Sequence, residues 1–550
     1  MPDGRSPGSA LAVPSPSGPS GGASFPRRDP EAGSLHRGLD RVKSHRLLTL
    51  IWLLAFTVFH LWLIASSRWP LSADEAQYWD WSRRLDWSYY SKGPAVAYLI
   101  ALSTRLGGHT EFWVRLPAVL LSTGTAAIAY LLARRIFQSE RAGFLSVVLL
   151  SLMPLYAAGS FLMTIDAPFV FCWGLASLFL HRAVQHRGKL AWYGAGVALG
   201  LGVLSKYTML MLVPCVLLWL VLSPKLRPWL GRREPYEAAA LALLISSPVI
   251  VWNARHGWLS GRHVLIQAGA GGERTLGAAL LGGPEFLGTQ LGVISPFLFV
   301  LLLLATAWAW HEGRRRGRDD LLLLACVSAP VFLFFQVWGF VTKVQANWAA
   351  HAYLTAAVAA TGWRERWVDW GERRRTTRRL NGLLLASILL PALLLPVAFF
   401  PELLGVFGTR VPAAVDLVSK RLRGWPELGQ AVGEAMQRAP RAPFLVSDRY
   451  QIASELAFYV PGNPRVWNAN LGRRMNQYDL WGDWDTLRGR DGLFVTYGSG
   501  DPPAELRLAF QEVSRLRVVS ITHRGQPLRD FSIYWGRDFR GFPPRAFTGY

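Results

Sequence analysis

The sequence predicts a polytopic α-helical membrane protein. Of its 550 residues, 51% are hydrophobic and only 17% are charged, which is too little charge for a soluble chain of this length. Three apolar runs, at residues 143–181, 190–222 and 321–363, each contain a single formally charged side chain. A helix needs about 20 apolar residues to cross the hydrocarbon core of a bilayer, so each run is long enough to cross twice.

The N-terminal residues 1–46 contain no apolar run. The first thirty or so are rich in Pro, Gly and Ser and cannot bury a core, so we expect a disordered cytoplasmic tail. They also lack the apolar segment of a cleaved signal peptide. The run at residues 47–67 is therefore predicted to be an uncleaved first membrane span.

Each of the three long runs is expected to fold as a helical hairpin with its charge at the tip. The three charges are Asp166, Lys206 and Lys343. A charge at the bilayer centre costs at least about 2.5 kcal/mol, so the tip is the place of lower energy. Pro168, close to Asp166, favours a helix break there.

Basic clusters flank these runs and set their expected orientation. They lie at residues 134–141, 182–189, 225–233, 314–318 and 364–379. The positive-inside rule places them in the cytoplasm, so every tip faces outward. Five single spans, at residues 47–67, 114–133, 238–252, 286–310 and 383–400, bring the count to about 11 helices. The clusters also account for the net charge of +23, and because they do not follow a groove, no nucleic acid is expected as a partner.

The transmembrane catalytic domain is expected to span residues 47–400 and to include two polar outer loops. The outer loop 68–113 alternates Trp, Tyr and charge (DEAQYWDWSRRLDWSYYSKGP), which is typical of helices lying in the membrane interface. A second outer loop spans residues 253–284. Residues 401–550 contain short alternating runs such as PFLVS and GLFVTYG, which predict a small α/β domain on the outer face.

This topology brings acidic and basic side chains to one surface. They are Asp74, Glu75, Lys92, Arg115, Asp166, Lys206 and Lys343, together with His256 and His263 of the second loop. A carboxylate can deprotonate an acceptor hydroxyl while Lys and Arg neutralise a phosphate leaving group, so the mixture suits transfer chemistry on an anionic lipid. No Walker A sequence is present. The activated group should therefore arrive attached to a membrane lipid.

Five short segments follow one another at the expected membrane depths. SADEAQYW follows the first span, YYSKGP closes the first loop, FWVRLPAVL opens the next helix, and FLMTIDAPF and GLGVLSKYT lie at two hairpin tips. Together they resemble the bacterial family 39 membrane glycosyltransferases of GT-C type, relatives of the protein O-mannosyltransferases and the lipid A aminoarabinose transferases. The resemblance covers about residues 47–222. VQANWAAHAYL is similar to a later family segment, and SDRYQIASELAFY and NLGRRMNQYDLW resemble the tail of one bacterial branch.

The resemblance implies an inverting transfer of a sugar from a polyprenyl-phosphate donor to a lipid, glycan or protein acceptor. It implies that Asp74, the first acid of the Asp-Glu pair, is the base or a metal-linked catalytic carboxylate, with Glu75 beside it. Asp166 matches the second carboxylate of the family. The expected partners are thus the lipid-linked sugar, its acceptor and the surrounding membrane lipid.

The same resemblance assigns the basic residues. Lys92 matches the lysine that contacts the lipid phosphate, and Arg115 and Lys206 match further basic positions near the donor. The residues expected to line the substrate path are Tyr89, Tyr90 and Lys343.

A metal requirement stays open. Aminoarabinose transferases often carry Glu before the first lysine, where this chain has Ser91, which puts a metal bridge through that position in doubt. No cofactor is certain from the sequence. A divalent cation (Mg, Mn or Zn) held by oxygen ligands is the alternative, with His256 and His263 as candidate ligands.

Structural interpretations of the same residues stand beside the functional ones. Asp74 and Glu75 could cap and begin an interfacial helix, and Asp166 could cap a hairpin. Lys206 and Lys343 could be anchors that extend to the membrane surface. An acid between two apolar helices nevertheless favours a function.

Another class of protein, a transporter or flippase of lipid-linked sugars, would also need a polar cavity for an anionic headgroup. Transporters tend to show internal repeats and charges near the membrane midplane, and neither pattern is obvious here. In the outer domain, Arg473 and Arg474 could form a solvated face or contact the acceptor.

Overall fold

The computed structural model describes residues 30–186, 188–269, 275–369, 374–407, 421–523 and 525–543. The chain divides into two compact units, Met1–Ser44 and His45–Tyr550, and the helices and sheet that carry the site belong to the second. Residues 1–29 of the expected tail lie outside the described residues. Helix α1 (Pro30–Ala65) begins before the predicted boundary at residue 47.

Within the described residues, seven helical segments are long and apolar enough to cross a membrane. They are Ser44–Ala65 of α1, α4 (Glu111–Phe137), Asp166–Gln185 of α7 (Asp166–His186), α10 (Arg233–Arg255), α13 (Pro296–Arg316), Asp319–Trp338, and Arg378–Phe399 of α17 (Arg374–Phe399). The segment Asp319–Trp338 contains α14 (Asp319–Cys326) and α15 (Ala329–Trp338). These helices confirm a polytopic membrane protein.

Shorter helices fill the spaces between the long ones. They are α5 (Glu140–Ser151), α6 (Pro154–Gly159), α8 (Lys189–Ser205), α9 (Leu212–Leu222), α12 (Leu276–Ile294) and α16 (Ala352–Asp369), with the 3-10 turns η1 (Tyr207–Met211), η2 (Arg227–Gly231), η3 (Ala346–Ala349) and η4 (Pro401–Phe407). Helix α8 packs between α7 and α10, and α16 packs against α4, α5 and α13.

Each of the three lone charges lies at a break between helices. Asp166 is the first residue of α7, after the irregular segment that follows α6. Lys206 separates α8 from η1 in extended conformation, and Lys343 lies between α15 and η3. A break ends the run of apolar backbone, so the charged side chain does not have to sit at the centre of a span.

The first outer loop folds into α2 (Ala73–Ser82) and α3 (Ala95–Gly107), and the second contains α11 (Leu259–Gln267). Helix α2 begins with a capping box, in which Ser72 accepts from the backbone N–H of Glu75 and the Glu75 carboxylate accepts from the backbone N–H of Ser72. This reciprocal pair satisfies two backbone donors at the helix start.

The C-terminal part folds around one five-stranded sheet. Its strands are β1 (Phe444–Ser447), β2 (Val466–Asn468), β3 (Gly492–Tyr497), β4 (Phe510–His523) and β5 (Gln526–Phe539), and its helices are α19 (Trp425–Gln437), α20 (Tyr450–Tyr459), α21 (Gln477–Leu480), η5 (Trp484–Leu487) and α22 (Ala504–Ala509). The strand order is β2-β1-β3-β5-β4. Strand β1 runs parallel to β2 and β3, whereas β5 runs antiparallel to β3 and β4. Residues 408–420 and 544–550 of this predicted domain lie outside the described residues.

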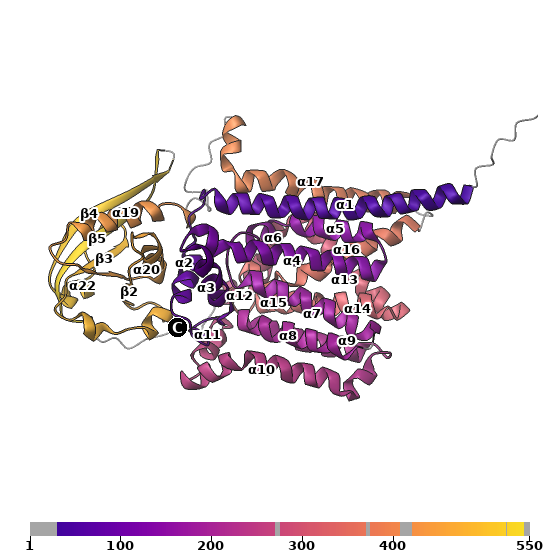
Figure 1. The fold of residues 1–550 in the computed structure, drawn as a ribbon, viewed down its shortest axis with the longest axis horizontal. Coiled ribbons are helices and arrows are strands. Elements are labelled where there is room, and N and C mark those ends of the chain that lie inside the picture. The colour runs from indigo at the N-terminus through magenta and orange to yellow at the C-terminus, as the bar shows by residue number, and fades with distance from the viewer. Residues whose placement is uncertain are drawn as a thin grey trace, which may run out of the picture. The chain divides into compact units, whose positions relative to one another are not determined.

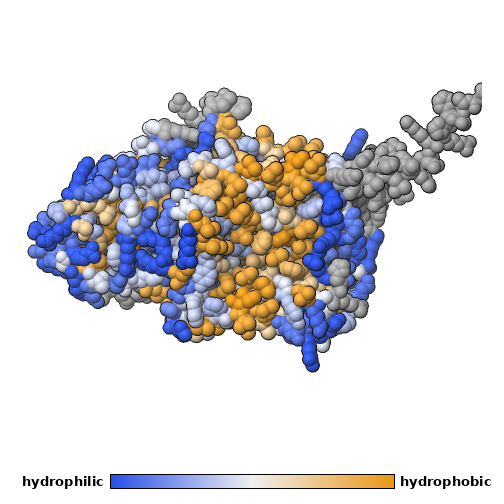
Figure 2. Space-filling model, viewed as in Figure 1, coloured by the Kyte–Doolittle hydropathy of each residue, from blue (hydrophilic) through white to orange (hydrophobic). Residues whose placement is uncertain are grey.

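Helices α2, α3 and α11 lie between the sheet and the long helices (Figure 1). Helix α20 packs directly on α2, and the rings of Trp79 and Phe458 meet edge to face at 4.9 Å between centroids. On the face drawn in Figure 2, apolar residues form a band over the helices with hydrophilic residues at both ends. The outer loop and the sheet domain therefore share one hydrophobic core, and this contact fixes the residues above the helix breaks.

Candidate active site

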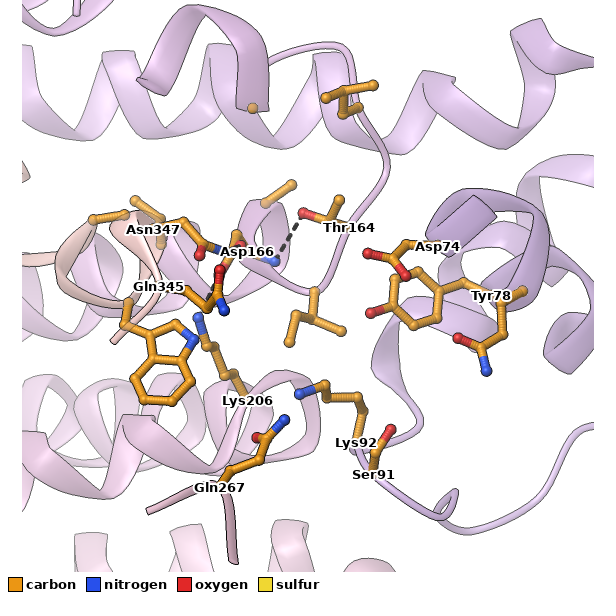
Figure 3. A pocket seen from close by; sticks show the side chains of 18 of the residues that line it. Asp74, Tyr78, Ser91, Lys92, Thr164, Asp166, Lys206, Gln267, Gln345 and Asn347 are labelled. Carbon is orange, nitrogen blue, oxygen red and sulfur yellow. Dashed lines mark hydrogen bonds and ion pairs between the residues drawn. The ribbon is translucent and has the colours of Figure 1, made fainter. Parts of the chain in front are cut away.

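A cavity of about 840 Å³ lies where the helix breaks, the outer loop and the C-terminal domain meet. Asp74, Lys92, Asp166 and Lys206 all line it. Figure 3 shows their side chains reaching from separate elements toward the same space. A volume of this size is in the ordinary range for a ligand pocket.

Asp74, in the first turn of α2, turns its carboxylate into the cavity (Figure 3). The helix is capped by Ser72 and Glu75 instead, so Asp74 is not needed as a cap. The Tyr450 hydroxyl of α20 donates to Oδ1 of Asp74 at 3.4 Å. The side chain is exposed to the cavity, and desolvation by the cavity walls raises the pKa of Asp74 above its ordinary value, despite the opposing charges of Lys92 and Arg421. A carboxylate with raised proton affinity is suited to accept a proton.

Asp166 is held by three polar contacts. Lys206 Nζ lies 2.7 Å from Oδ1, and Asn347 Nδ2 donates to Oδ2 at 2.6 Å. The backbone N–H of Asp166 donates to Thr164 Oγ1 at 3.3 Å, as the dashed line in Figure 3 marks. Each carboxylate oxygen thus has one side-chain partner, and Asp166 holds Lys206 and Asn347 at the cavity wall.

Lys92 reaches the cavity because its loop lies against the end of α8. A Cβ at Gly93 would stand 2.1 Å from the carbonyl oxygen of Leu204, so only glycine permits this approach. Among the described side chains, none makes a hydrogen bond or ion pair with Lys92 Nζ. Burial, followed by the positive charge of Lys206, lowers the pKa of Lys92 to about 8. A bound anion would relieve both effects, so the position favours an anionic ligand.

Glu75 and Arg115, predicted as a catalytic acid and a phosphate-binding base, form a buried pair outside the cavity lining. Arg115 Nε and Nη2 each lie 2.8 Å from Glu75, and the guanidinium also donates to the carbonyl oxygens of Trp69 and Pro70. Glu75 additionally accepts from the backbone N–H of Met163 at 3.0 Å. The structure therefore does not bring these two side chains to the cavity, and the pair joins the outer loop to α4.

We expect Glu75→Gln to destabilise the protein strongly. The change leaves the Arg115 guanidinium buried without its counter-charge, which typically costs about 3–5 kcal/mol. Thermal unfolding of the purified protein in detergent measures the loss. The matched control is Glu285→Gln, because Glu285 pairs with Lys343 at 3.3 Å but both side chains are exposed, and such a pair contributes about 1 kcal/mol or less. Equal melting temperatures for the two variants would contradict the structural role of the buried pair.

Of the three residues predicted to line the substrate path, two line the cavity and one does not. Tyr89 does not line the cavity, because its ring stacks on Trp81 at 4.4 Å and its hydroxyl donates to the carbonyl oxygen of Trp81 at 3.0 Å. The structure therefore does not place Tyr89 in the cavity lining. Tyr90 and Lys343 do line it.

The two histidines are not brought together. His256 stacks on Trp252 with 4.0 Å between ring centroids and does not line the cavity. His263 does line it, and burial together with the charges of Lys92 and Arg474 lowers the pKa of His263 to about 3. In the part of the chain that the structure describes, no three His, Cys, Asp or Glu side chains form a group that could share a metal ion. The neighbouring positive charges oppose a cation at His263, so these residues do not fit a metal centre.

Several lining residues escaped the sequence prediction. Asn347 lies within VQANWAAHAYL and Gln477 within NLGRRMNQYDLW, so the resemblance marked their segments but not the side chains. Of the two arginines considered in the sequence, Arg474 lines the cavity and Arg473 does not. Gln477 Oε1 accepts from the backbone N–H of Tyr90 at 2.6 Å and joins α21 to the outer loop. Arg421 and Tyr450 also reach the cavity from the C-terminal part.

Comparison with known proteins identifies relatives of the chain. A family model described as dolichyl-phosphate-mannose-protein mannosyltransferase matches residues 91–252. The lipid A galacturonosyltransferase RgtD of Rhizobium johnstonii is 31% identical over 336 residues, which are 61% of this chain and 68% of that protein. An undecaprenyl phosphate-alpha-4-amino-4-deoxy-L-arabinose arabinosyl transferase of Pectobacterium carotovorum is 27% identical over 331 residues, and the match spans 56% of its length.

Solved structures show the same fold. ArnT from Cupriavidus metallidurans in the apo state superposes with a TM-score of 0.60 at 16% identity, over 88% of this chain and 97% of that one. The same protein bound to undecaprenyl phosphate gives a TM-score of 0.59. The chain therefore belongs to the family of membrane glycosyltransferases that includes the lipid A galacturonosyltransferase and the arabinosyl transferases, and it is a glycosyltransferase.

Proposed function

We propose that the chain transfers a sugar, with inversion, from a polyprenyl-phosphate donor to a hydroxyl of a lipid, glycan or protein acceptor at the outer face of a bacterial cytoplasmic membrane. One observation carries the proposal. Asp74 and Lys92, an acid and a base without an ion-pair partner among the described residues, line one cavity next to the Asp166–Lys206 pair. One relative is named for lipid A and another for an undecaprenyl-phosphate sugar, and these two names support the proposed acceptor and donor.

The reaction assigns one role to each end of the cavity. Asp74 takes the proton of the acceptor hydroxyl, whose oxygen attacks the anomeric carbon. The bond between that carbon and the phosphate oxygen breaks, and its electron pair stays on the phosphate. The leaving polyprenyl phosphate gains one negative charge, which Lys92 and Lys206 neutralise.

Asp166 supports this step without touching the proton. It holds Lys206 on one oxygen and Asn347 on the other. Both groups are thereby oriented before the donor binds, which lowers the entropic cost of reaching the transition state.

The proposal includes the eleven crossings expected from the sequence. Helices α1, α4, α10, α13 and α17 cross singly. The three hairpins are α5 with α7, α8 with α9, and the segment Asp319–Trp338 (α14 and α15) with α16. The basic last turns of α4 and α13, far from the helix breaks along their helices, support a cytoplasmic N-terminus. The sheet domain is then extracytoplasmic.

Transfer in detergent tests the proposed function. We expect the purified protein in micelles to convert a radiolabelled undecaprenyl-phosphate sugar, given a lipid A acceptor, into glycosylated lipid and free undecaprenyl phosphate. Micelles have no second compartment, so a flippase would leave the donor chemically intact. An unchanged donor and acceptor in this assay, with protein that still binds undecaprenyl phosphate, would contradict the enzyme assignment.

A further inference from the structure

Helix α20 of the C-terminal domain contacts the first turn of α2, where Asp74 lies. Tyr450, the first residue of α20, donates its hydroxyl hydrogen to Asp74 Oδ1 at 3.4 Å. One turn later on the same helix, the Ser454 hydroxyl donates to the carbonyl oxygen of Ala73 at 3.2 Å. Side chains four positions apart lie on one face of a helix. One face of α20 therefore holds two successive residues of α2.

The helix that carries Tyr450 is also held at its other end. The Tyr459 hydroxyl, at the last residue of α20, accepts from the backbone N–H of Leu71 at 2.7 Å. Between the two ends, Ile452 and Leu456 are buried in the core that the outer loop shares with the sheet domain. The Tyr450 hydroxyl therefore reaches Asp74 from a fixed position.

The contact with Tyr450 distinguishes the two oxygens of Asp74. Oδ1 accepts the tyrosine hydrogen, whereas Oδ2 has no hydrogen-bond partner among the described residues. The side chain lines the cavity. A hydrogen bond on one oxygen limits rotation of the carboxylate about its Cβ–Cγ bond, so the other oxygen stays available to an acceptor hydroxyl.

Tyr450 can serve as the donor throughout the physiological pH range. Desolvation, followed by the negative charge of Asp74, raises the pKa of Tyr450 above its ordinary value, against the opposing charges of Arg474 and Arg473. The hydroxyl therefore keeps its hydrogen while Asp74 gains and loses a proton.

The groups around Asp74 act on its pKa in opposite directions. Desolvation and the charge of Glu75 raise the pKa of Asp74, whereas the charge of Lys92, the hydrogen bond from Tyr450 and the charge of Arg421 lower it. Of these four described side chains, Tyr450 is the one that hydrogen-bonds the carboxylate. It can therefore orient the ionised form as well as stabilise it.

We propose that Tyr450 is a positioning residue of the transfer reaction, which holds Oδ1 of Asp74 so that Oδ2 meets the acceptor hydroxyl. The proton of that hydroxyl passes to Oδ2, and Tyr450 keeps its own. The catalytic centre is thus completed by a residue 376 positions away from the base. This inference rests on the proposed function, in which Asp74 is the base, and adds to it a task for the C-terminal domain.

Tyr450→Phe tests the proposal, because it removes the hydroxyl and keeps the ring. The hydrogen bond favours the ionised carboxylate, so its loss should raise the pKa of Asp74 and move the acid decline of kcat/KM to higher pH by about one unit. On the acid side of the decline, transfer should therefore fall about tenfold. KM for the donor should not change, because Lys92 is intact. The measurement is the pH profile of transfer from a radiolabelled undecaprenyl-phosphate sugar to lipid A in micelles.

Ser454→Ala is the matched control. It removes the neighbouring hydrogen bond from α20 to α2 without touching the carboxylate, so the acid decline should stay at the wild-type pH even if the melting temperature falls. An equal shift in Ser454→Ala and Tyr450→Phe would overturn the proposal, since looser packing of α20 would then explain it. A profile of Tyr450→Phe that is unshifted, or lowered uniformly at every pH, would overturn it as well.

Asp74→Asn separates this inference from the proposed function. If Asp74 is the base, this variant loses transfer at every pH, and adding Tyr450→Phe to it should have little further effect. Transfer retained by Asp74→Asn would remove the base and this inference with it. Transfer lost in Asp74→Asn, together with an unshifted profile in Tyr450→Phe, would refute the positioning role alone.

Discussion

Asp74→Asn should reduce sugar transfer about 10²- to 10⁴-fold, the contribution of a general base. The amide has nearly the same shape as the carboxylate but cannot accept the acceptor proton. The Tyr450 hydroxyl can still donate to the amide oxygen, so the fold and membrane insertion should be unchanged. The measurement is the initial transfer rate in membranes that contain equal amounts of wild-type and variant protein.

Asp86→Asn is a matched control for this variant. Asp86 lies on the same outer loop and accepts from Trp252 Nε1 at 2.8 Å, but it does not line the cavity. Its transfer rate should stay close to the wild type. Near wild-type transfer by Asp74→Asn would remove Asp74 from the role of base, and loss of transfer in both variants would point to a general sensitivity of the loop.

Changes at Lys92 should alter both the rate and its pH dependence. The pKa of about 8 for Lys92 means that the side chain is charged below this pH and neutral above it. Donor binding needs the charged form, so kcat/KM of the wild type should fall about tenfold per pH unit above pH 8. At the acid end, kcat/KM should fall once the pH drops below the raised pKa of Asp74.

Two substitutions test this assignment. Lys92→Gln should lower kcat/KM about 10²-fold, as expected when one charge-stabilising contact to the leaving group is removed, and should abolish the decline above pH 8. Lys92→Arg keeps a charge that does not titrate in this range, so the decline should move to higher pH. A pH profile that is identical in wild type and Lys92→Arg would mean that another group causes the basic decline.

The parts of the site that follow from the cost of placing a charge in the bilayer could be predicted from the sequence. A charge is excluded from the bilayer centre, so Asp166 and Lys206 had to lie at helix breaks, and both do. The family motifs then added Asp74 and Lys92. All four line the cavity.

Glu75 was assigned to the site because it adjoins Asp74 in the sequence, and the structure does not place it in the cavity. Successive residues of a helix point about 100° apart, because there are 3.6 residues per turn, so adjacency in the sequence does not by itself place both acids of the pair in one cavity. The pattern Ser72 to Glu75 is itself the signature of a capping box, and this signal would have assigned Glu75 to the helix start. Its pairing with Arg115 depends on a contact between residues 40 positions apart, which no local pattern specifies.

The residues that the C-terminal domain contributes to the cavity could not be predicted for the same reason. Tyr450 contacts Asp74 across 376 positions of the sequence, and the approach depends on how α20 packs against α2. Burial of rings such as Trp79 and Phe458 fixes this packing. The hydrophobic effect is not directional, so the sequence does not show which apolar side chains will pack against one another.

The cavity is assembled from two parts of the chain that carry separate tasks. The helix breaks supply Asp166 and Lys206, while the segment 470–477 supplies Arg474 and Gln477. A graft of that segment from a relative would exchange the groups facing the incoming substrate and leave the lipid-phosphate contacts in place. Substrate choice and use of the lipid carrier can therefore diverge independently in such a chain, which gives enzyme engineering a short, defined stretch to vary.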